Sequence, residues 1–226
     1  MADDTAPPTD SDLRSLPLFP LPDMVLLPGA VVPLHIFEAR YRKLMADVLG
    51  GNRLFALPRL VPGFETEYEA KPSVFPICGV ARVTEDTRLP DGRYNIVVTG
   101  VARVRILEEL PSLPYRRARV ERLVDGDATS SQELMAWHAQ LAALCERLAP
   151  HLAESARNLR ELVRQAPNAS ACADRVAAAV VADPDERQQL LEELDPGRRM
   201  ALLADRLREL ISAMQGVDSR RSLDLN

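Results

Sequence analysis

The chain has 226 residues, of which 46% are apolar, 27% charged and 4% aromatic. This length and composition are typical of an ordered globular protein with one large or two small domains, and they exclude a chain that is disordered throughout. The formal net charge of −5 disfavours a strongly basic nucleic-acid binder. The three cysteines show no CxxC or CxxH spacing, so we predict neither a disulfide framework nor a zinc site.

The N-terminal residues are acidic and lack the basic-then-apolar order of a secretion signal. We expect residues 1–12 to form a disordered tail. The longest apolar stretch, Met24 to Leu34, is about half of the roughly 20 residues that a membrane-spanning helix needs, and prolines interrupt it. The sequence therefore predicts a cytoplasmic protein that does not associate with membranes.

Residues 13–125 have the pattern of β structure interrupted by one helix. Proline recurs throughout this half and forbids long helices. Leu89-Pro-Asp-Gly-Arg93 predicts a hairpin turn, and Phe64–Ala70, with alternating glutamates, predicts a solvent-facing loop. The expected helix, Phe37–Leu49, has Phe37, Tyr41, Leu44, Met45 and Val48 on one side. The β-prone runs are Val31–Ile36, Arg53–Leu57, Val74–Val83, Tyr94–Val98, Val101–Leu107 and Arg116–Val124.

Residues 126–215 are rich in Ala, Leu, Arg and Glu and predict a bundle of short helices. Ser130-x-x-Glu133 is a capping box that opens the first helix, and Asp183-Pro184 and Asp195-Pro196 each predict a helix start. We expect residues 216–226 to form a flexible tail. The apolar stripe of the first helix is Leu134, Trp137, Leu141, Leu144, Cys145 and Leu148, and further helices are expected over Ala156–Gln165, Ala171–Ala182, Pro184–Leu194 and Pro196–Met214.

The segment Leu16–Leu44, LPLFPLPDMVLLPGAVVPLHIFEARYRKL, resembles the opening of the N-terminal domain of Lon protease. The resemblance continues in Gly79-Val-Ala-Arg-Val83 and in Asp91–Ile106, and then in the helical half through Ala173-Asp174 and Asp183–Glu192. The matching positions of the first segment are Leu18, Phe19, Leu21, Val25, Leu27, Pro28, Gly29, Pro33, Leu34, Ile36, Phe37, Glu38, Arg40 and Tyr41.

This resemblance implies an α+β fold: a PUA-like, mostly antiparallel β barrel carrying one helix, followed by a C-terminal helical bundle. It also implies a protein that holds unfolded or damaged polypeptides without cutting them. The sequence contains no GxxxxGK[ST] motif and no counterpart of the Lon peptidase domain, so we predict no catalytic residues, no cofactor and no metal. Cooperation with a full-length Lon protease and a homodimer are both left open.

Five apolar residues of the opening segment are candidates for peptide binding: Phe19, Leu21, Met24, Val25 and Leu27. Prolines keep this stretch extended and delete backbone donors, which favours an incompletely paired edge that accepts an extended peptide. The other interpretation is that most of these side chains are core residues shaped by a proline-rich loop.

The alternative function is binding of RNA or a small ligand by the PUA-like unit, with Arg116, Arg117 and Arg119 as the candidate residues. Nucleic acid is the less favoured partner, because acidic residues offset most of the arginines between residues 82 and 125 and few aromatic side chains are available for base stacking. Glu38 and Arg42 have the spacing of a surface pair on a helix, which predicts a structural role.

Overall fold

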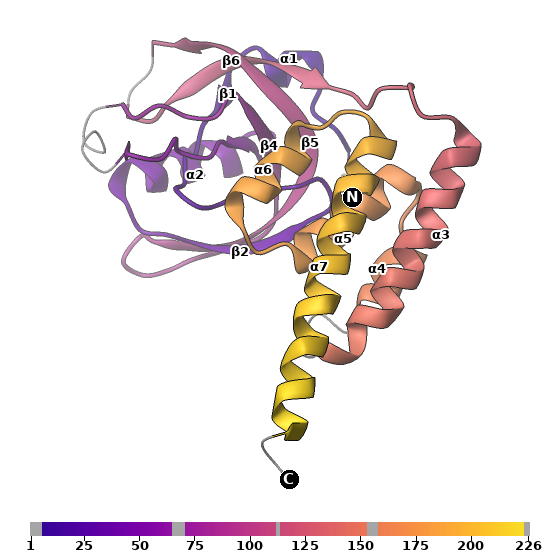
Figure 1. The fold of residues 1–226 in the computed structure, drawn as a ribbon. Coiled ribbons are helices and arrows are strands. Elements are labelled where there is room, and N and C mark those ends of the chain that lie inside the picture. Colours follow the sequence, from indigo (N-terminus) through magenta and orange to yellow (C-terminus); the bar gives the residue numbers. More distant parts are fainter. Residues whose placement is uncertain (1–5, 65–70, 112–113, 153–157, 224–226) are drawn as a thin grey trace. The chain divides into compact units, whose positions relative to one another are not determined.

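A computed structural model describes residues 6–64, 71–111, 114–152 and 158–223 of the chain. The chain divides into two compact units, Met1–Val124 and Asp125–Asn226 (Figure 1). The sequence placed this boundary one residue later, between residues 125 and 126. The alternating glutamates of the expected loop at residues 64–70 lie outside the described residues.

The first unit is an antiparallel sheet, which confirms the predicted fold class. The strands lie in the order β1-β6-β5-β4-β3, and β2 pairs with β5 (Figure 1). The two β-prone runs around residue 100 form one long strand, whose first part pairs with β2 and whose last part pairs with β6. The bounds are β1 (Leu16–Pro17), β2 (Val31–Ile36), β3 (Leu54–Leu57), β4 (Ile77–Arg88), β5 (Tyr94–Leu110) and β6 (Arg117–Leu123).

The segment that follows β1 closes the sheet. The backbone N–H of Leu18 donates to the carbonyl of Arg116 just before β6 at 2.8 Å, and the next N–H, of Phe19, donates to the carbonyl of Ala56 in β3 at 2.8 Å. One short stretch of chain therefore joins the two ends of the strand order, and this closure removes two of the sheet's edges.

Two glycines allow the chain to cross the sheet at close range. A Cβ atom at Gly79 in β4 would lie 2.1 Å from the carbonyl oxygen of Leu26, and one at Gly100 in β5 would lie 2.2 Å from that of Leu27. Both contacts are with backbone, which cannot swing aside as a side chain can. Glycine is therefore required at both positions for the segment 26–27 to pack on the strands.

Helix α2 (Ala39–Leu49) packs its expected apolar face on the core, with Tyr41 in edge-to-face contact with Phe19 at 4.5 Å between ring centroids. The prediction for Phe37 is wrong, because this side chain is 61% exposed. The helix begins only after Glu38, so Phe37 continues the alternation of β2 and points outward. Glu38 stands just before the helix and pairs with Arg40 at 2.9 Å.

The disordered tail expected over residues 1–12 is wrong for residues 6–12. A short helix, α1 (Asp10–Leu13), begins at a capping box between Thr9 and Asp12. The amide of Asn52 donates to the Asp12 carboxylate at 2.6 Å, and Arg82 donates to the carbonyl of Ala6 at 3.0 Å. These contacts fix the segment to the sheet, which the acidic composition of the tail did not indicate.

The second unit is helical, as predicted. The capping box is present, with the Ser130 N–H donating to the Glu133 carboxylate at 3.0 Å, and the Asp183 carboxylate accepts from two N–H groups of the first turn that follows. The flexible tail expected from residue 216 is instead helical through Leu223. The elements are α3 (Ser131–Leu148), the 3₁₀ helix η2 (Ala149–His151), α4 (Leu159–Arg164), α5 (Ala169–Val180), α6 (Pro184–Glu192) and α7 (Pro196–Leu223).

Candidate functional site

The five apolar residues that the sequence offered for peptide binding divide into two groups. Phe19, Val25 and Leu27 are buried, with exposed fractions of 5%, 4% and 0%. Leu21 and Met24 are half-buried and pack against the core cluster that surrounds α2. We therefore do not assign the first three side chains to a binding surface, because closing the sheet uses them as core. Only Leu21 and Met24 keep surface that a partner can contact.

A groove of about 440 Å³ lies beside the end of β5, and we call it the β5-end groove. One wall is the segment 71–76, held in place by the Ile106 N–H donating to the Pro76 carbonyl at 2.8 Å and by the Val61 N–H donating to the Ser73 carbonyl at 2.9 Å. The opposite wall is the end of β5. The lining residues are Pro72, Val74, Pro76, Ile106 and Leu107, with Lys71, Ser73, Glu108, Glu109 and Arg116 among them.

Leu107 is an exposed apolar side chain of this groove. The pairing register of β5 with β6 shifts between Ile106 and Glu108, so Leu107 is the extra residue of a β-bulge and has no partner on β6. Its side chain is 43% exposed. Bulges re-aim side chains at the edges of sites, and here the bulge presents a leucine to solvent beside two prolines.

The charges at the β5-end groove neutralise one another. The Arg116 guanidinium donates to both carboxylate oxygens of Glu109, at 3.0 and 2.5 Å, and the Lys71 ammonium lies 2.9 Å from the same carboxylate. Burial alone would raise the pKa of Glu109, but the hydrogen bonds and charges of Arg116 and Lys71 outweigh it and hold the pKa below its usual range. The groove therefore combines an apolar floor with a compensated polar rim.

Ion pairs also involve the arginines that the sequence suggested as RNA-binding residues. Arg116 is bound to Glu109, and Arg119 donates to Glu108 at 2.8 Å. Arg117 donates to the carbonyl of Ser15 at 3.1 Å. Because phosphate binding requires uncompensated cations, two of the three candidate arginines already have carboxylate partners and are poorly placed to hold a nucleic-acid backbone.

A second groove, of about 370 Å³, lies on the outward face of β2, β5 and β4, and we call it the β2-face groove. His35 of β2 hydrogen-bonds the side chain of Asn95 of β5 at 2.7 Å and stacks on Phe37, with ring centroids 6.2 Å apart. Val31, at the other end of β2, is 65% exposed. The groove is lined by Pro33, Leu34, His35, Glu85, Asp86, Thr87, Asn95, Ile96 and Val97.

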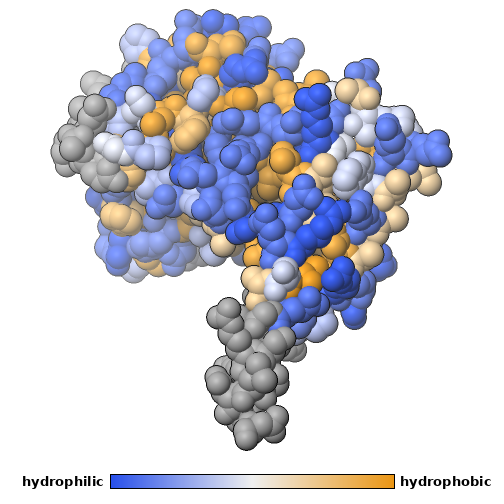
Figure 2. Space-filling model, in the orientation of Figure 1, coloured by the Kyte–Doolittle hydropathy of each residue, from blue (hydrophilic) through white to orange (hydrophobic). Residues whose placement is uncertain are grey.

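Sequence reasoning did not find either groove. The strand β2 was predicted with its correct bounds, but nothing in its own residues shows that it would pair with β5. The apolar surface of the first unit forms separate patches between hydrophilic ones on the face that Figure 2 shows.

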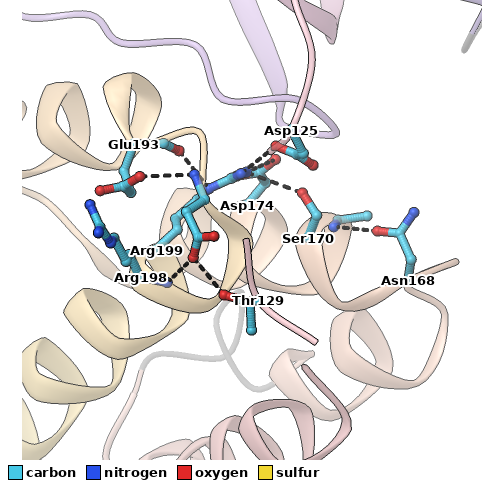
Figure 3. Close-up of polar contacts among 10 residues, drawn as sticks. Asp125, Thr129, Asn168, Ser170, Asp174, Glu193, Arg198 and Arg199 are labelled. Carbon is cyan, nitrogen blue, oxygen red and sulfur yellow. Dashed lines mark hydrogen bonds and ion pairs between the residues drawn. The ribbon is translucent and has the colours of Figure 1, made fainter. Parts of the chain in front are cut away.

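The most buried polar cluster belongs to the second unit and is centred on Arg199, whose side chain is fully buried (Figure 3). Its guanidinium donates to Asp174 at 3.1 Å, to Asp125 at 2.5 Å and to the Ser170 hydroxyl at 3.1 Å. Asp174 is itself 2% exposed. Because these groups satisfy one another, the cluster joins the first residue of the unit to α5 and α7, and we assign it a structural role.

The cysteines are also structural. All three are buried and free, and burial raises the pKa of Cys78 and Cys145 to about 12 and that of Cys172 to about 11. Within the described ranges, no group of three or more His, Cys, Asp or Glu side chains is arranged to hold a metal ion. In the same part of the chain, none of the helices has the length and apolar character needed to span a bilayer.

We compared this chain with known proteins and protein families. A family model described as the ATP-dependent protease La (LON) substrate-binding domain matches residues 15–209. The chain is similar to the Lon protease of Anaeromyxobacter dehalogenans, with 28% identity over 207 residues that cover 90% of this chain and 24% of that protein. It is equally similar to Lon protease 2 of Myxococcus xanthus, with 28% identity, 90% of this chain and 25% of that protein. The chain thus spans about a quarter of the length of these relatives.

Two solved structures have the same fold. The N-terminal domain of the Mycobacterium avium complex Lon protease superposes with a TM-score of 0.66 at 21% identity, covering 86% of this chain and 98% of that one. The Lon N-terminal domain protein from Xanthomonas campestris superposes with a TM-score of 0.60 at 27% identity, covering 84% and 96%.

Proposed function

Since this chain belongs to the family of LON substrate-binding domains, we propose that it is a recognition module that binds extended apolar segments of unfolded or damaged polypeptides. It acts by binding and carries out no peptide-bond cleavage of its own. Its clients are unfolded chains, and the proteolytic step is left to a Lon protease with which it cooperates.

The observation that carries this proposal is the β5-end groove, an apolar trench with a neutralised rim. Its exposed Leu107 and Pro76 offer contact area to apolar side chains. Because Glu109 is already paired with Arg116 and Lys71, the groove does not select for a strongly charged ligand. Such a surface suits many different unfolded sequences at weak affinity, of about micromolar strength, in which apolar burial is offset by the cost of ordering the client.

The test is a titration of the purified chain with a fluorescently labelled, reduced and alkylated globular protein as a permanently unfolded reporter. We expect saturable binding at micromolar to tens of micromolar concentration, weakened by Leu107→Gln. Complete burial of a leucine side chain contributes about 1.5–3 kcal/mol, and 43% of this side chain is exposed and available. The affinity should therefore fall by about 3- to 9-fold.

Met135→Gln is the matched control. Met135 is 75% exposed on α3 in the second unit, so it replaces an exposed apolar side chain that lies outside the groove. We expect it to leave the affinity within about 2-fold, because surface changes away from a binding feature alter free energies by about 0.5 kcal/mol or less. Absence of reporter binding at 100 micromolar chain, or equal loss in the two variants, would contradict the proposal.

A further inference from the structure

Strand β2 exposes one unpaired edge. In the part of the chain that the structure describes, β2 pairs with β5 alone. Gly100 of β5 exchanges both of its backbone hydrogen bonds on the β2 side, accepting from Gly29 at 2.8 Å and donating to Ala30 at 2.9 Å. The N–H and C=O groups of successive residues point to opposite sides of a strand. The backbone groups of Val98, Ile96 and Tyr94 therefore also face β2.

The register then fixes which groups of β2 face away from β5. Val32, Leu34 and Ile36 lie opposite the three residues of β5 whose backbone groups face β2. The backbone groups of these three β2 residues therefore point towards β5. The N–H and C=O groups of the interleaved residues therefore point to the free edge. The absence of an N–H on Pro33 agrees with this placement, because proline is tolerated where no ladder bond is needed. These interleaved residues are Val31, Pro33 and His35, and we call their outward backbone groups the β2 edge.

The side chains beside the β2 edge suit a further strand. On the inner face Val32 and Leu34 are half-buried and pack against the core cluster, so an added strand would complete their burial. On the outer face Val31 and Phe37 are 65% and 61% exposed. The β2 edge therefore has apolar surface on both faces and a backbone that offers two donors and three acceptors, since Pro33 supplies only its carbonyl.

The β2-face groove adds a charge. Pro33, Val97 and Glu85 lie opposite one another on β2, β5 and β4 and form one row across the sheet. Asp86 is paired with Arg53 at 2.5 Å, whereas Glu85 has no ion pair among the residues that the structure describes. An added strand would lie about 14 Å from β4, three strand spacings away. A long basic side chain on that strand can approach Glu85 when both side chains are extended along the groove.

We propose that an extended client segment binds by strand addition at the β2 edge, with apolar residues at alternate positions and an arginine or lysine on its outward face. This inference rests on the proposed function and adds a second site, with its own binding mode, for the same class of client. Backbone hydrogen bonds hold any extended sequence, while the apolar alternation fixes which face of the segment turns inward. We therefore expect the β2 edge to prefer client segments in which apolar residues alternate and one outward residue is basic.

The test leaves the protein unchanged and alters the client backbone. A fluorescein-labelled ten-residue peptide alternates leucine or valine with serine and carries one central arginine. Two versions are N-methylated at three alternate residues, one at the apolar positions and one at the serine and arginine positions. Strand addition predicts that only one version loses affinity, by at least tenfold, because only one set of N–H groups faces β2. Methylation at the serine and arginine positions is the harmful one for an antiparallel client, and at the apolar positions for a parallel client.

Location is tested with protein variants against the unmethylated peptide. Phe37→Ser should weaken binding about 3-fold or more, while Met135→Ser, the matched change on α3, should leave it unchanged. Glu85→Gln should reduce affinity for the arginine peptide but not for a version with glutamine in its place. Equal effects of the two methylated peptides would overturn strand addition. So would sedimentation showing a dimer that persists with peptide bound and that Phe37→Ser dissociates, since a second copy would then occupy the edge while the peptide binds elsewhere.

The two proposals fail separately. Saturable binding of the unfolded reporter together with equal effects of the two methylated peptides would leave the recognition function in place and remove the binding mode. The opposite outcome is a peptide that loses affinity in only one of the two methylated versions, with no binding of the unfolded reporter. This result would keep the β2 edge as a peptide site and remove the broader function.

Discussion

Replacing Arg199 by methionine is the most severe test of how the helical unit is held together. The variant removes the guanidinium that donates to the buried Asp174 carboxylate at 3.1 and 3.3 Å, and also the 2.5 Å bond to Asp125. Asp174 is 2% exposed, so water cannot replace the lost partner. Breaking a buried ion pair by removing one member costs about 3–5 kcal/mol, a large share of the 5–15 kcal/mol typical of a domain.

The expected loss is measured by urea unfolding at pH 7 and 25 °C, with tryptophan fluorescence as the signal. The chain has one tryptophan, Trp137 on α3, so the signal reports on the second unit alone. Arg198→Met is the matched control, because Arg198 is the exposed neighbour of Arg199; its free energy of unfolding should stay within about 0.5 kcal/mol of the parent. The double variant Arg199→Met with Asp174→Asn should lose less than the sum of the two single variants, because the stranded charge is gone.

A loss below about 1 kcal/mol for Arg199→Met would refute this reasoning, since it would mean that Asp174 is solvated or paired without Arg199. Strictly additive losses in the double variant would also refute it. In that case the two residues would stabilise the unit separately, and the link from the first residue of the unit to α5 and α7 would not depend on their charge pairing.

Three further predictions concern the rest of the fold. Gly100→Ala should lower the free energy of unfolding of the first unit by about 1–3 kcal/mol or more, measured by circular dichroism, because the added Cβ would lie 2.2 Å from the Leu27 carbonyl oxygen; an unchanged stability would contradict the close crossing. The lowered pKa of Glu109 predicts stability that is complete above its ordinary pKa of 4.5 and is lost as the pH falls through the lower folded value, and Glu109→Gln should make this acid loss shallower. Cys145, whose pKa burial raises to about 12, should resist iodoacetamide at pH 8 until urea unfolds the chain; rapid labelling of the folded protein would show that the thiol is accessible.

Local signals in the sequence predicted the elements well. Strand β2 has the predicted bounds, and Gly92, with a φ of 82°, occupies the predicted hairpin turn. The Ser130 capping box begins α3 as expected. These features depend on a few neighbouring residues, whose chemistry sets the local backbone whatever the rest of the chain does.

The same signals failed where distant contacts decide the outcome. Asp12 is acidic and close to the terminus, yet its hydrogen bonds to Thr9 and Asn52 order a segment that composition assigned to a tail. Phe37 fits the helical period of α2, but pairing of β2 with β5 ends the strand at Ile36 and turns Phe37 outward. Periodicity within a segment cannot distinguish these cases, because the competing contact comes from elsewhere in the sequence.

The candidate surface illustrates why apolar residues are a poor guide to binding in a closed sheet. A closed sheet needs large apolar side chains in its interior. The apolar opening segment supplies some of them, as the burial of Phe19 and Leu27 shows. What remains for a partner are the sites where closure is incomplete, namely a bulge at Leu107 and an edge strand containing Pro33. Both are irregularities of pairing, and pairing is a property of two strands together. A binding surface of this kind therefore follows from topology, and a sequence predicts it only once the partner of each strand is known.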